Sequence, residues 1–147
     1  MSLVEGLISV SDFVQALFPS SNILKQNVPL QPSSDSFVVR FQNERRESET
    51  RFHTVIERNF QVVYFNSDIQ EVLRKMDSLS RMSLNKRIVI PIKDSLRYMR
   101  IESFSFSQPF ETESELNAIT GVLSVQVREA RDQETYEKIM QVNSRIE

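Results

Sequence analysis

Hydrophobic and polar residues alternate along residues 52–65, and a helical period follows directly. Every second position, counted from Phe52, forms a mostly hydrophobic set, so the pattern predicts a strand with that set facing the core. Over residues 67–82, apolar positions recur every three or four residues and predict an amphipathic helix. Ser67, followed three positions later by Gln70, is expected to cap the start of that helix. A strand packed beside its own following helix is therefore predicted.

The same periodicities predict the remaining elements of the chain. Residues 2–18 carry a helical stripe, with Ser2 and Glu5 as a candidate capping box, although a helix that starts only at Ser11 also fits the pattern. Pro91 restricts its own strand to an edge or an end, because proline cannot donate to a ladder. Further strands are expected at 37–42, in the run that begins at Asn85 and ends at a turn over 93–95, at 96–107 and at 119–131. A short extended stretch is expected within 23–35 and a short terminal helix at 135–142.

This order of elements predicts one α+β domain over residues 1–147. We expect a mostly antiparallel sheet with the two main helices packed on one face and with long hairpins. The polar stretch 43–51 cannot contribute to a core and is expected to be a solvated hairpin end that projects from the sheet. The acidic stretch 109–117 is expected to be a loop, or in part a helical turn.

Composition narrows the function classes. The chain has no cysteine, one histidine and a formal net charge of −2, which argue against disulfides, thiolate or all-histidine metal sites, and a bulk positive surface for nucleic acid. Only two glycines occur, so the glycine-rich loops that hold phosphates are absent and no cofactor is expected. No apolar run approaches the roughly 20 residues that span a bilayer, so we expect no membrane partner and a soluble intracellular protein.

Few residues suggest chemistry. His53 has no motif around it and is expected to be a plain surface or interface residue, so an enzyme is the least favoured class. Glu111, Glu113 and Glu115 alternate in a way that could chelate a hard cation, but a solvated loop is the more ordinary explanation, and no metal site is predicted.

Two surfaces are candidates for binding. One strand face carrying Tyr98, Arg100, Phe104 and Phe106 could stack exposed bases, although packing beneath the helices explains the same aromatic residues. The projecting stretch 43–51 mixes both signs of charge, which suits a specific protein partner better than a nucleic acid. Its charged residues are Glu44, Arg45, Arg46, Glu47, Glu49 and Arg51.

The layout as a whole resembles the tail terminator, or tail-completion, proteins of long-tailed bacteriophages and phage-derived elements. The resemblance covers nearly the whole chain and consists of the order and spacing of its elements. It is carried by a first helix ending at Phe18-Pro19, an extended segment leading to Phe37-Val38-Val39, a returning strand with Arg58, Phe60, Val62 and Tyr64-Phe65, a helix over 69–79, a strand pair, and a last strand ending in Val125, Val127 and Arg128.

The resemblance implies a non-enzymatic virion protein that forms a ring, commonly hexameric, at the head-proximal end of the tail tube. Its implied partners are copies of itself, the tail tube protein and the head-tail connector, with DNA only passing through the ring. It implies a place in the virion tail after assembly in the host cytoplasm. By position, the candidate interface residues are Glu44, Arg45, Arg46, Glu49, Arg51, Glu111, Glu113 and Glu115. Another head-tail connector or minor tail component, and a nucleic-acid-binding sheet, are the alternatives.

Overall fold

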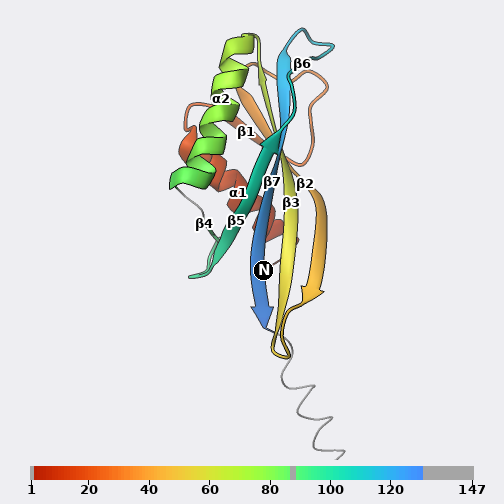
Figure 1. Cartoon of the computed structure of the whole chain (residues 1–147). Coiled ribbons are helices and arrows are strands. Elements are labelled where there is room, and N and C mark those ends of the chain that lie inside the picture. The colour runs from red at the N-terminus through yellow and green to blue at the C-terminus, as the bar shows by residue number, and fades with distance from the viewer. Residues whose placement is uncertain (1, 87–88, 131–147) are drawn as a thin grey trace, which may run out of the picture.

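A computed structural model describes residues 2–86 and 89–130, which form two helices and a seven-stranded sheet (Figure 1). The helix expected at 135–142 lies outside the described residues. The elements are α1 (Leu3–Leu17), β1 (Asn22–Lys25), β2 (Ser36–Ser48), β3 (His53–Asn66), α2 (Ile69–Arg81), a π-helical turn (Met82–Lys86), β4 (Val89–Pro91), β5 (Tyr98–Phe106), β6 (Phe110–Glu111) and β7 (Asn117–Ala130).

The strands are ordered β1-β2-β3-β7-β5-β4, and β6 pairs with the first residues of β7. β1 runs parallel to β2, and the other described pairings are antiparallel. The longest ladder joins β3 to β7, from His53 opposite Ala130 to Asn66 opposite Asn117. The sheet is therefore mixed and the fold α+β. β4 lies at an edge of the sheet, where the backbone N–H that Pro91 lacks is not needed by a further strand.

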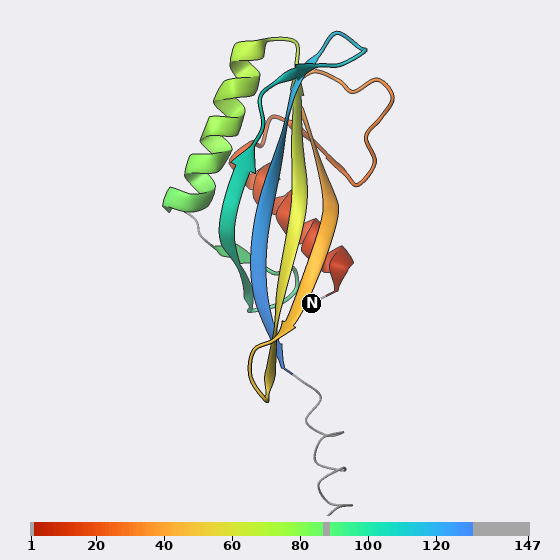
Figure 2. The ribbon, with the colours of Figure 1, turned by 45° about the vertical axis from the view of Figure 1, so that its right-hand side comes forward.

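Both helices lie against one face of the sheet (Figure 2). Their buried side chains pack on the inward-facing residues of the strands, and this cluster is the main core. The principal contributors are Val10, Phe13 and Val14 of α1, Val72, Met76 and Leu79 of α2, and Phe37, Ile56, Phe60, Val62, Tyr64 and Leu123 of the sheet. The expected core face of β3 is confirmed except at Phe52, which lies in the turn before the strand and is half exposed.

The two helix starts differ in how well they were predicted. α1 begins at Leu3 and not at Ser11, with the expected capping box between Ser2 and Glu5. The cap of α2 is Asp68, whose carboxylate accepts from the backbone N–H of Gln70 at 3.0 Å, so the predicted role of Ser67 is wrong. The backbone N–H of Ser67 donates to Ser34 Oγ at 3.2 Å, and the first helical residue is Ile69, one position later than a cap at Ser67 would give.

Two segments expected to be loops contain strand. Residues 43–48 continue β2 and pair with β3 as far as Ser48, because a ladder needs backbone partners and not apolar side chains. Only the last few residues of the stretch 43–51 belong to the hairpin turn. In the acidic stretch, Phe110 pairs with Ala118, so this stretch is the two-stranded end of a hairpin and not a helical turn.

Candidate functional site

The sheet extends beyond the helices as a narrow projection (Figure 2). The ladder between β5 and β7 ends at Arg100 opposite Gln126, whereas the β3 ladders continue to the hairpin turn. Past that point β2, β3 and β7 continue to pair with one another without β5, and residues 46–56 and 127–130 are called here the sheet tip. Its two outer edges present backbone donors and acceptors together with charged side chains, which is how proteins prevent indiscriminate strand pairing.

Ion pairs link the hairpin turn of the sheet tip to β7. Both carboxylate oxygens of Glu49 accept from Arg128 Nε, at 2.7 and 3.0 Å, and Arg46 lies 3.7 Å from Glu129. The hydrogen bond to Glu49 raises the pKa of Arg128 above its ordinary value. Arg45 pairs with Glu47 at 2.6 Å along the same strand. Most of the charges expected to contact a partner therefore also brace the projection internally.

One arginine of β3 is buried beneath the start of α1. Arg58 is only 3% exposed, its Nε donates to Glu44 Oε1 at 2.6 Å, and its Nη1 donates to the backbone carbonyl of Ser2 at 3.2 Å. Burial of a guanidinium requires charged or polar partners, and here β2 and the helix start supply them. Glu44 therefore helps, through Arg58, to hold the start of α1 on the sheet.

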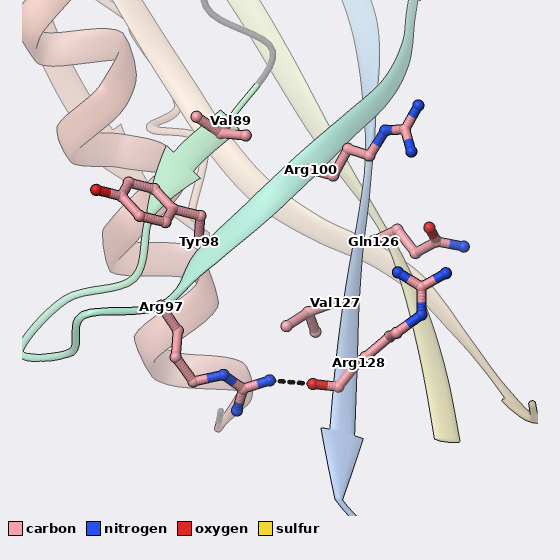
Figure 3. Close-up of a pocket in the computed structure, with 7 residues that line it drawn as sticks. All are labelled: Val89, Arg97, Tyr98, Arg100, Gln126, Val127 and Arg128. Atoms are coloured by element: carbon pink, nitrogen blue, oxygen red, sulfur yellow. Dashed lines mark hydrogen bonds between the residues drawn. The ribbon is translucent and has the colours of Figure 1, made fainter. Parts of the chain in front are cut away.

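A pocket opens where β5 diverges from β7 (Figure 3). Its volume is about 230 Å³ and it is partly open to solvent. The lining residues are Val89, Arg97, Tyr98, Arg100, Gln126, Val127 and Arg128. Because three of the seven carry guanidinium groups, the name arginine pocket is used below.

The strand divergence explains how the arginines come together. Arg97 lies just before β5, beyond the last ladder contact with β7, and its Nη2 donates to the backbone carbonyl of Arg128 (Figure 3). Arg100 projects from β5 with its side chain 68% exposed, and its nearest acid is Glu102, 3.7 Å away. The sequence did not single out this cluster, since these arginines come from strands that are neighbours only in the folded sheet.

The acidic residues occupy the other end of β7. The hairpin of residues 110–117, called the acidic hairpin below, closes with the backbone N–H of Thr112 donating to Leu116 at 2.8 Å. Glu111, Glu113 and Glu115 are exposed, and no ion pair joins them to any other described residue. Among the described residues no group of three or more candidate metal ligands gathers here or elsewhere.

The structure also places His53 and the four residues of the proposed base-stacking face. His53 is exposed, and its backbone carbonyl accepts from Glu49 and Thr50 to close the hairpin turn. The four residues proposed as a base-stacking face do not share one, because the pairing of β5 shifts between Ile101 and Ser103. Phe104 consequently enters the main core, whereas Tyr98 and Arg100 are exposed on the opposite face, so that prediction is wrong.

Comparisons with known proteins give distant likenesses to solved structures. No protein-family model matches the chain, and no curated protein matches it. One solved structure is 17% identical, over 90% of this chain and 97% of its own, with a TM-score of 0.43. A chain from the virion of a native gene transfer agent particle is 12% identical, over 88% of this chain and all of its own, with a TM-score of 0.42. Likenesses this weak assign no role. No helix in the described part of the chain is long and apolar enough to cross a membrane.

Proposed function

We propose that this chain is a structural assembly protein of a phage-type virion, and more narrowly a tail terminator. In this role, copies of the chain form a ring that ends the tail tube and presents a surface to the head-tail connector, while DNA only passes through. The protein acts through its shape and its charges and catalyses no reaction.

The observation that carries the proposal is that opposite ends of one sheet present complementary surfaces. The arginine pocket lies at one end of β7 and the acidic hairpin at the other. A ring requires heterologous contacts, in which one patch of a subunit meets a different patch of its neighbour. The layout of the sequence, with its resemblance to tail terminators, supports the narrower assignment.

The sheet tip adds a second surface suited to assembly. Strands of 13 and 14 residues hold it away from the helices, and the Arg128 to Glu49 pair fixes its turn. A braced projection loses little conformational entropy when a partner binds it, which favours specific recognition. Another connector or minor tail component would use the same features, and only the position in the particle separates these two functions.

The test is assembly, followed by loss of function in the particle. Sedimentation velocity over a range of concentrations should show a closed oligomer, alone or on added tail tubes. Electron microscopy of particles lacking the protein should show tails of abnormal length or tails without heads. A strict monomer that never caps tubes would overturn the proposal, and tails of normal length that fail only to bind other components would favour the alternative.

A further inference from the structure

Only part of the positive charge of the arginine pocket is paired with acidic groups among the described residues. Arg97 makes no ion pair with any described residue and is bonded to a backbone carbonyl. Arg100 has only a long contact with Glu102, at 3.7 Å, and Arg128 is already bound by Glu49. Guanidinium groups that line one open pocket favour a carboxylate or phosphate ligand with several acceptor oxygens.

The acidic hairpin is complementary to the pocket in both charge and apolar surface. Glu111, Glu113 and Glu115 provide three exposed carboxylates on a short projecting turn. Beside them Phe110 is 46% exposed, and the pocket in turn exposes Tyr98 by 59% and Val89 by 43%. An aromatic side chain between charged groups at a contact is typical of protein interfaces.

These two surfaces cannot meet within one chain. β7 pairs with the hairpin at Ala118 and with Arg100 at Gln126. At about 3.3 Å per residue, the strand separates them by roughly 25 Å. A contact between them therefore joins two copies, and because the patches differ, it is heterologous and can close into a ring.

We propose that the arginine pocket of one copy receives the acidic hairpin of the next, with Arg97 and Arg100 binding carboxylates of Glu111 and Glu113. This contact rests on the self-assembly proposed above and specifies its interface. Two charged surfaces of opposite sign would also make assembly fall steeply with ionic strength.

The experiment uses charge reversal on each side of the contact in the full chain. Arg100→Glu alone and Glu113→Lys alone should each weaken self-association about tenfold or more, because like charges then face each other. An equimolar mixture of the two variants should assemble again, since each restores the complement that the other lacks. Arg81→Glu is the matched control, because Arg81 lies on α2 with its side chain 70% exposed, and it should leave assembly unchanged.

The possible results distinguish failure of this contact from failure of the proposed function. Oligomers that tolerate both reversals overturn the contact and leave the proposed function standing. A wild-type chain that stays monomeric at every concentration and on tubes overturns both. A further experiment titrates the wild-type chain and Arg100→Glu with a short DNA duplex at low salt. If Arg100→Glu abolishes DNA binding and leaves assembly intact, the pocket is a phosphate site and the proposed contact is wrong.

Discussion

Replacement of Gly121 by alanine tests how tightly β7 is packed beneath the helices. Gly121 lies between β3 and β5, opposite Val62 on one side and Phe106 on the other. Its backbone conformation is one that any residue adopts, so only space argues for glycine. A Cβ atom added here would lie 2.7 Å from Phe104 Cζ and 3.0 Å from Cε2 of the same ring.

The magnitude follows from that distance. Ordinary contacts begin near 3.4 Å, so the ring of Phe104 must move by about 0.7 Å within a packed core, and overpacking of this kind costs about 1–3 kcal/mol. Without the clash, the same substitution would stabilise the fold by about 0.4–1 kcal/mol, because alanine restricts the unfolded chain more than glycine does. Gly121→Ala is therefore expected to lower the stability of the fold, whereas the same substitution in an open strand would raise it.

Urea denaturation of the purified variant measures the loss in free energy of unfolding. The midpoint temperature of thermal unfolding should fall by roughly 3–9 °C. A rescue variant identifies the cause. In Gly121→Ala with Phe104→Leu, the smaller side chain should relieve the clash, so that the double variant loses less than the sum of the single losses. Unchanged or increased stability of Gly121→Ala, or simple additivity with Phe104→Leu, would refute the close packing described here.

Three further substitutions address polar contacts. Tyr64→Phe removes the donor of a 2.6 Å hydrogen bond to Asp35 and should cost about 1.5–3 kcal/mol in urea denaturation. Burial opposes ionisation of Asp35, but this bond and one from Ser21 outweigh it and hold the pKa of Asp35 below the ordinary 3.8. The carboxylate therefore stabilises the fold above pH 3.8, and this contribution is lost as pH falls through the lowered pKa. In Tyr64→Phe the free energy of unfolding should consequently fall less steeply with acidification than in the wild type. Arg58→Met should cost about 2–4 kcal/mol, because it leaves a partly buried carboxylate without its cation, and an unchanged midpoint would contradict that role. Asp68→Ala should cost about 1 kcal/mol through loss of the cap, whereas Ser67→Ala, its matched control, should change stability by less than about 0.5 kcal/mol; equal effects would show that Asp68 is not the cap.

Sequence reasoning was most reliable where neighbours along the chain decide the structure. The capping box of α1, the apolar stripe of α2 and the alternation of β3 each depend on residues within a few positions of one another. Hydrogen bonding of a helix start and burial of one strand face act over that same short range. The predicted class and most of the element order followed from these local signals.

Prediction from the sequence failed where pairing with a strand far away in the chain decides the local structure. The shift in pairing between Ile101 and Ser103 turns Phe104 toward the helices, against the simple alternation of β5. Residues 43–48 are polar enough to be a loop, yet they form strand because β3 offers a ladder beside them. Neither outcome has a local signal in the sequence.

The amino-acid sequence by itself determined the two helices, the long central strands and the face of β3 that is buried, because periodicity fixes which side chains can leave water together. Only the tertiary structure decided that Arg97, Arg100 and Arg128 gather at one pocket while the glutamates of the acidic hairpin stay at the far end of β7. The physical reason is that strand register and strand divergence are set by pairing between segments far apart in the chain, and these place the charges in space.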